Sequence, residues 1–136
     1  GYKAALEGAG IAFDPALVVQ GDYNENSGVQ AVTQLLAARQ RFTAIFAAND
    51  QMAIGAAHGL QRHGLRVPDD VSLVGFDDLP TSLYALPPLT TIRQPAYELG
   101  QLAARAMMHL LAGEKPTLQV PAPRLIVRES CRRLSA

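Results

Sequence analysis

The fold class follows from residues 43–78, which read TAIFAANDQMAIGAAHGLQRHGLRVPDDVSLVGFDD. The runs 43–48 and 71–76 are almost continuously apolar, which is typical of strands that are covered on both faces of a sheet. Between them, residues 49–63 carry a helical pattern that stops at Gly64, a residue type that commonly ends helices. A strand, a helix and a strand at this spacing predict a right-handed βαβ unit with a parallel sheet, and therefore an α/β fold.

The same alternation extends toward the N-terminus. Residues 1–9 predict a helix with one apolar face, and residues 17–19 predict a strand that ends at Gly21. A second helix is expected to start at Ser27 as its N-cap, with an apolar stripe at Val29, Val32, Leu35 and Leu36. Helices and strands thus alternate through the first half of the chain.

Beyond Asp78 this alternation stops. Residues 79–94 contain three prolines and predict a loop with one short helical turn. Residues 96–112 predict the clearest helix of the chain, because apolar side chains recur at Leu99, Leu102, Ala103, Ala106, Met107, Leu110 and Leu111. Residues 117–127 are β-like, but their two prolines confine them to an edge strand or an irregular strand.

Composition excludes several classes of protein. The 136 residues fit one domain, and 12 basic residues against 12 acidic ones give no net charge with which to hold phosphates, so this stretch is not expected to bind DNA by itself. The apolar runs are too short to span a membrane, and no membrane partner is expected. The single cysteine, Cys131, permits no intrachain disulfide, which is compatible with a reducing compartment.

Polar residues follow each of the three predicted strands of the first half. They are the segments 21–23, 49–50 and 77–78. Ligands of open parallel sheets bind beyond the carboxyl ends of the strands, so the three segments are candidates to line one crevice.

Each segment also has a purely structural interpretation. One of Asn49 and Asp50 caps the helix that follows, and the pattern favours Asp50 for that role. The pair 77–78 has the composition of a turn, and Tyr23 has the ordinary alternative of a half-buried surface ring.

The sequence holds little that could serve an enzyme. His58 and His63 are five residues apart, a spacing that does not place them on one helix face for metal binding, and His109 lies on the polar face of its helix. Cys131 lies in a charged tail, and neither a glycine-rich nucleotide loop nor a nucleophile elbow is present in the sequence. We therefore expect no catalytic residues, no metal site and no cofactor.

Four stretches resemble the lactose/galactose-repressor family of bacterial transcription regulators. They are residues 44–56, 67–78, 87–95 and 124–130. The resemblance covers essentially the whole chain. It implies a Rossmann-like subdomain with a parallel sheet, of the periplasmic-binding-protein-like fold, corresponding to the C-terminal part of the effector-binding domain.

The resemblance also implies the partners. Members of the family carry a separate N-terminal helix-turn-helix domain, so operator DNA is expected to be bound only through that domain, in the cytoplasm. The effector is expected to be a small molecule, either a sugar or a nucleoside or purine. The alternative, a periplasmic sugar-binding protein of a transport system, shares the fold.

Four residues match family positions that bind the effector. Asn49 resembles an asparagine that bonds ligand hydroxyls, and Asp77 resembles a carboxylate that accepts from two adjacent hydroxyls. Tyr23 takes the place of an aromatic residue that packs on the ligand, and Gln94 lies at the hinge crossing near the pocket. Ala96 departs from the family, because some sugar-sensing members carry an aromatic residue there.

The resemblance implies a homodimer as well. The predicted interface consists of Ile54 and His58, which are four residues apart on one helix, and of Thr81 and Tyr84. The alternative for Ile54 is a place in the core. The helix 96–112 is expected to pack on the N-terminal subdomain, which lies outside this sequence. In the chain alone we expect it to pair with its counterpart in a second copy or to fold back onto the sheet.

Overall fold

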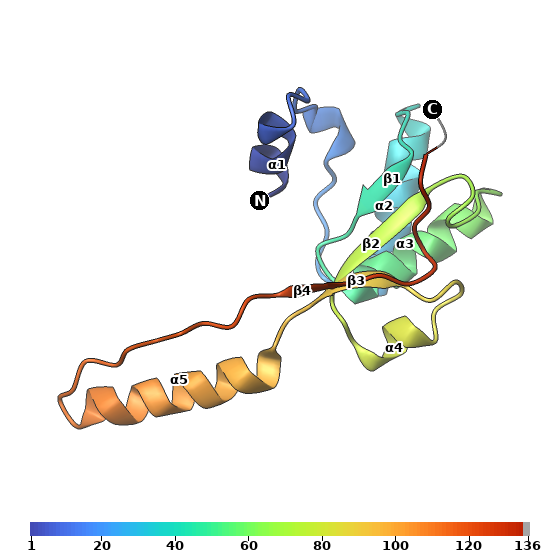
Figure 1. The fold of residues 1–136 in the computed structure, drawn as a ribbon. Helices are drawn as coiled ribbons and strands as arrows, with labels where there is room; N and C mark the ends of the chain where they lie inside the picture. The colour runs from blue at the N-terminus through green and yellow to red at the C-terminus, as the bar shows by residue number, and fades with distance from the viewer. Residues whose placement is uncertain (135–136) are drawn as a thin grey trace.

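The computed structural model describes residues 1–134 and is built around a four-stranded sheet (Figure 1). Its strands follow the order β1 (Ala44–Phe46), β2 (Ser72–Asp77), β3 (Thr90–Arg93) and β4 (Arg124–Ile126). The first three strands are parallel, and β4 runs antiparallel to β3 at the edge. The expected α/β fold with a mostly parallel sheet and an edge strand near the C-terminus is confirmed.

Two helices, α2 (Glu25–Ala37) and α3 (Asp50–Arg62), pack closely against each other beside this sheet. Glycines make the approach possible, because a Cβ atom on Gly28 would overlap the carbonyl oxygen of Met52, and one on Gly55 would overlap that of Glu25. The buried core between the helices and the sheet consists of Val32, Ala47, Met52, Ala53, Ala56, Leu60, Val71, Leu73 and Leu89.

The N-cap of α2 differs from the prediction. Asn24 caps the helix, since its Oδ1 accepts a hydrogen bond of 3.0 Å from the backbone N–H of Ser27. The Oγ of Ser27 instead donates to the carbonyl oxygen of Asn24. The helix therefore begins earlier than expected, because Asn24 is as good a cap as serine and stands three residues before it.

The predicted strand 17–19 is wrong. The first of these residues, Leu17, ends the 3-10 helix η1 (Pro15–Leu17), and Val18 is extended, but residues 18–20 belong to no strand. A cavity of about 400 Å³ separates residues 17–19 from β1, so their backbone groups have no strand within hydrogen-bonding reach among the described residues. The same gap leaves Phe46 52% exposed, and β1 is therefore not covered on both faces as expected.

The proline-rich segment 79–94 contains more order than predicted. The expected helical turn is α4 (Pro80–Leu83), but β3 follows it and lies inside the sheet, with Thr90 and Thr91 buried. Prolines flank β3 without entering it, so they remove no donor from its ladder.

Both terminal helices lie away from the core. The helix α1 (Tyr2–Gly8) and the long α5 (Ala96–Leu111) contain no buried residue. Figure 1 shows α5 projecting from the sheet, with residues 112–123 returning alongside it. Of the two outcomes expected for this helix, folding back onto the sheet is wrong, and pairing with a second copy stays a prediction. No helix in residues 1–134 has the length and apolar character that crossing a membrane requires.

Residues 128–132 form what we call the C-terminal clasp. Ser130 bridges two strands, since its Oγ donates to the carbonyl oxygen of Leu73 at 2.6 Å and accepts from the N–H of Thr90 at 2.7 Å. Its own carbonyl oxygen accepts from the N–H of Leu73. The clasp thus completes the hydrogen bonding where β2 and β3 begin.

Candidate functional site

Three of the four predicted effector-binding residues lie at the carboxyl ends of adjacent strands, which we call the carboxyl edge. The register pairs Phe46 with Val74, and Asn49 and Asp77 each follow that pair by three residues. Asp77 in turn pairs with Arg93, and Gln94 comes next. The parallel sheet therefore brings these side chains to one edge, as the strand order requires.

Asn49 has a structural role at this edge. Its Oδ1 accepts from the N–H of Met52 at 2.8 Å and caps α3, and its Nδ2 donates to the carbonyl oxygen of Tyr23 at 2.9 Å. The preference for Asp50 as the cap is therefore wrong. Asn49 is 8% exposed and keeps one amide hydrogen of Nδ2 without a partner in the described residues.

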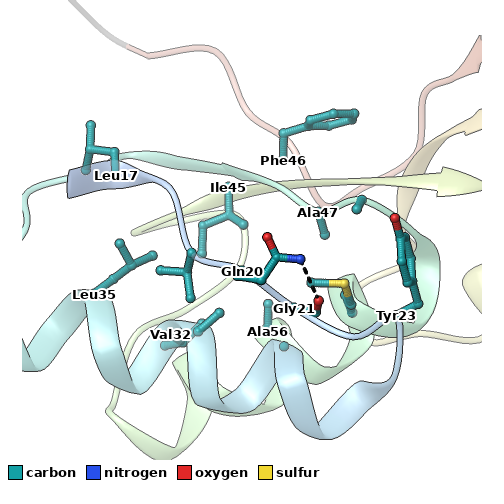
Figure 2. A pocket seen from close by; sticks show the side chains of 15 residues that line it. Leu17, Gln20, Gly21, Tyr23, Val32, Leu35, Ile45, Phe46, Ala47 and Ala56 are labelled. Atoms are coloured by element: carbon teal, nitrogen blue, oxygen red, sulfur yellow. Dashed lines mark hydrogen bonds between the residues drawn. The ribbon is translucent and has the colours of Figure 1, made fainter. Parts of the chain in front are cut away.

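Tyr23 lies in the loop that Asn49 holds. Its φ of 68° is a left-handed conformation, and its side chain is 65% exposed. Figure 2 shows the ring at one end of a cavity of about 250 Å³ whose lining is mostly apolar. Asn49, Asp77 and Gln94 do not line this cavity, so it is not the crevice that the sequence predicted. The exposed ring face remains open for packing on a ligand.

Asp77 is joined to Gln94 across the ends of β2 and β3. The Nε2 of Gln94 donates to Oδ1 of Asp77 at 3.1 Å, and no described residue donates to Oδ2 of Asp77. Asp77 and the following Asp78 have φ values of 110° and 60°, a conformation that costs non-glycine residues on the order of 1–3 kcal/mol and that occurs preferentially at functional sites.

Asp78 differs from Asp77 because it is neutralised within the chain. Its carboxylate accepts from Nε of Arg93 at 2.5 Å and from Nη2 of Arg128 at 2.6 Å, and its side chain is 5% exposed. Burial alone raises the pKa of Asp78, but the hydrogen bonds from Arg128 and Arg93 outweigh it and bring the pKa below the ordinary value of 3.8. Asp78 therefore stabilises the turn through its two arginine partners. Asp77 is the carboxylate that has an oxygen, Oδ2, without a donor among the described residues.

Asp50 has a buried role that the sequence did not predict. It is completely buried, and its carboxylate accepts from Thr91 Oγ1 at 2.5 Å, from Ser82 Oγ at 2.6 Å and from the N–H of Leu79 at 2.7 Å. A usable signal was present, because only one of two adjacent polar residues at a helix start can cap it, and the other must find partners elsewhere.

The four predicted dimer residues lie on two elements that the fold brings close. Ile54 is half-buried and His58 exposed on α3, and both line a shallow depression with Ala85 and Leu86. Ile54 is absent from the buried core, so its alternative placement there is wrong.

Thr81 on α4 and Tyr84 just after it are exposed. Together with Ile54 and His58, they make up the predicted interface, which we call the dimer face. Leu86, which is 92% exposed, adds apolar surface to the depression beside them.

Residues 1–134 contain no group of three His, Cys, Asp or Glu side chains placed to hold a metal ion. The chemistry at the carboxyl edge that is open to a ligand consists of one carboxylate with a free oxygen and one amide hydrogen.

Comparison with known proteins gives a consistent result. A family described as "Periplasmic binding protein-like domain" matches residues 1–131. The ribose operon repressor of Haemophilus influenzae is 38% identical over 132 residues, which is 96% of this chain and 40% of that protein. This chain thus spans less than half the length of that relative.

Solved structures agree. The transcriptional regulator CelR in complex with cellobiose has a TM-score of 0.89 and 39% identity, over 95% of this chain and 40% of the other. The lac repressor dimer bound to operator and the anti-inducer ONPF has a TM-score of 0.86 and 34% identity, over 96% of this chain and 46% of the other. These relatives are transcriptional regulators and not enzymes.

Proposed function

This chain belongs to the LacI-type family of transcriptional regulators with a periplasmic-binding-protein-like effector domain, and we propose that it senses a small sugar. In this proposal the chain is the C-terminal part of the effector-binding domain of a cytoplasmic repressor. A separate N-terminal domain binds operator DNA, which agrees with the lack of net positive charge in these residues.

The observation that carries the proposal is the free Oδ2 of Asp77 at the carboxyl edge. The amide of Asn49 lies at the same edge, beyond the end of the adjacent strand β1. A carboxylate makes charge-assisted hydrogen bonds to neighbouring hydroxyls of a sugar, and an exposed aromatic ring such as Tyr23 covers the apolar face of a sugar ring. Gln94 orients the carboxylate from the side of β3.

A sugar is favoured over a nucleoside or purine by two relatives. One is named as a ribose operon repressor, and the other was solved with cellobiose. A periplasmic binding protein is disfavoured, because these relatives are regulators that match the chain almost from end to end.

We propose that the regulator is a homodimer held through the dimer face. This face combines the exposed side chains of His58, Thr81 and Tyr84 with half-buried Ile54, and the exposed Leu86 lines the adjoining depression. An apolar centre with polar surroundings is typical of symmetric interfaces, and the lac repressor to which this chain is similar was solved as a dimer.

The test is a thermal-shift screen of the full-length regulator with D-ribose, cellobiose, adenosine and hypoxanthine. A stabilising sugar should also change the affinity for operator DNA, because the two binding events are linked. Stabilisation by adenosine or hypoxanthine alone would reject the sugar class, and a sugar effect without any change in DNA binding would reject the regulatory role.

A further inference from the structure

Asp50 carries a carboxylate that is completely buried. Burying a carboxylate is costly unless several donors compensate for the lost water. Here three donors converge on it from the backbone of Leu79 and the hydroxyls of Ser82 and Thr91, all within 2.5–2.7 Å. Gly75 of β2 leaves the space, because a Cβ atom there would overlap Oδ1 of Asp50. The fold thus provides a complete, fitted site for this one carboxylate.

Two of the donors anchor the carboxyl edge. Leu79 directly follows Asp78, so its hydrogen bond fixes the chain where it leaves the left-handed pair 77–78. Thr91 lies in β3 and precedes Gln94, the residue directly after that strand, by three positions. Both partners of the bond between Asp77 and Gln94 are therefore tied to the same buried carboxylate.

The third donor anchors the dimer face. Ser82 is the one buried residue of the short helix α4, which carries Thr81 and is followed by Tyr84. Its Oγ donates to Oδ2 of Asp50, and its carbonyl oxygen accepts from the N–H of Leu89. A single turn of helix has little stability of its own, so this attachment determines where α4 lies.

We propose that Asp50 is a positioning residue that couples effector binding at the carboxyl edge to dimerisation through α4. This inference rests on the proposed function. All three donors share one hydrogen-bonded cluster. A shift of Leu79 or Thr91 at the carboxyl edge therefore moves the carboxylate of Asp50 and with it Ser82 on α4, and the reverse also holds. The two binding equilibria then share a coupling free energy through Asp50.

The experiment uses Thr91→Val and Ser82→Ala in the full-length regulator, because each removes one donor and neither residue is itself a predicted ligand or dimer contact. We measure the dimer dissociation constant by sedimentation equilibrium, and the affinity for D-ribose and cellobiose by calorimetry. Thr91→Val should weaken the dimer about tenfold, and Ser82→Ala should weaken sugar binding about tenfold. The control Asp69→Asn, at an exposed carboxylate, should change both by less than about twofold.

A double variant separates coupling from simple destabilisation. If both donors act through Asp50, the double variant Ser82→Ala/Thr91→Val should change the free energy of dimerisation, and that of sugar binding, by less than the sum of the changes in the two single variants. Additive effects would overturn the inference. It is likewise overturned if Thr91→Val alters only sugar affinity while Ser82→Ala alters only dimerisation.

Failure of the proposed function gives a different pattern. If neither sugar binds the wild type, the sugar proposal is wrong, and the dimer constant of Thr91→Val still decides the coupling. If the wild type is a monomer, the dimer proposal is wrong and the coupling to dimerisation fails with it; the sugar affinity of Ser82→Ala then shows only whether Asp50 positions the carboxyl edge. In Asp50→Asn, the Leu79 amide should exchange with solvent at least about tenfold faster than in Asp69→Asn. An unchanged rate would show that Asp50 does not position this segment.

Discussion

Gln94 donates a hydrogen bond of 3.1 Å to Oδ1 of Asp77, which joins the ends of β2 and β3 through two side chains that the sequence had assigned to effector binding. The contact leaves the second carboxylate oxygen of Asp77 available for a ligand. It also orients the carboxylate before any ligand arrives, which lowers the conformational entropy lost on binding.

Asp77→Asn should weaken sugar binding by the full-length regulator roughly tenfold or more, because the charge-assisted bonds to hydroxyls are lost. The asparagine keeps the acceptor for Gln94 and tolerates the φ of 110°. Calorimetry with the sugar that stabilises the wild type measures the effect. Asn49→Ser, which preserves a capping oxygen and removes the Nδ2 donor, should act in the same direction. Affinities within twofold of wild type in both variants would refute the assignment.

Ile54→Asp should convert the full-length regulator to monomers, because two symmetry-related carboxylates would be buried in the apolar part of the dimer face. Multi-angle light scattering reports the mass directly. The matched control is Gln30→Asp, an exposed position on α2 that lies outside this face. A dimer of unchanged mass in Ile54→Asp places the interface elsewhere.

Stability should fall in acid in a way that depends on Asp78. Its pKa lies below 3.8 in the folded chain, so the unfolded state binds protons more readily. The stabilisation is complete above the ordinary pKa and is lost as the pH falls through the lowered one. Urea unfolding between about pH 7 and pH 3 measures this change. Asp78→Asn should be less stable at neutral pH and should lose less on acidification, whereas an unchanged pH slope would exclude Asp78 as a contributor.

The apolar side of α5 should drive association of the 136-residue chain by itself. Met107, Leu110 and Leu111 are each more than half exposed, and full burial of such a side chain contributes about 1.5–3 kcal/mol. Small-angle scattering should show species larger than a monomer. Leu110→Glu should reduce them, and Gln101→Glu on the opposite face should not. A compact monomer in the unmodified chain contradicts the expectation.

Gly55→Ala should destabilise the chain by roughly 1–3 kcal/mol or more. The new methyl group would overlap the backbone of Glu25, and a backbone cannot relieve the overlap by changing rotamer as a side chain could. Gly100→Ala provides the comparison within one protein. Position 100 lies in α5 with no atom close to an added Cβ, so alanine there should stabilise the helix by about 0.5–1 kcal/mol. Equal unfolding midpoints for the two variants would contradict the close packing of α2 on α3.

The sequence predicted the elements whose signal is local. The apolar runs at β1 and β2 and the stripe of α5 were visible, because side-chain periodicity follows from backbone geometry. Residues 17–19 have the same β-like composition. A strand forms only where a second strand lies within reach of its backbone hydrogen bonds, and composition does not show whether such a partner exists. Thr90–Arg93 was missed for the opposite reason: prolines at either end concealed a short strand that the sheet supports.

The site was predictable only in part. The residue types at the carboxyl edge could be located, because parallel strands end at one edge. Gln94, 17 positions from Asp77, determines which oxygen of Asp77 stays free, and Arg93 and Arg128, 15 and 50 positions from Asp78, neutralise that residue. Such contacts leave no periodic pattern in a single sequence.

The C-terminal clasp has a consequence for how this protein is made. Ser130 bonds to Leu73 and Thr90, partners 57 and 40 residues earlier in the chain. During synthesis the beginnings of β2 and β3 therefore remain incompletely paired until residues 128–132 have left the ribosome. A nascent chain stalled before Ser130 would present open strand ends to chaperones and to neighbouring chains, so the emergence of the clasp is the step that closes the sheet.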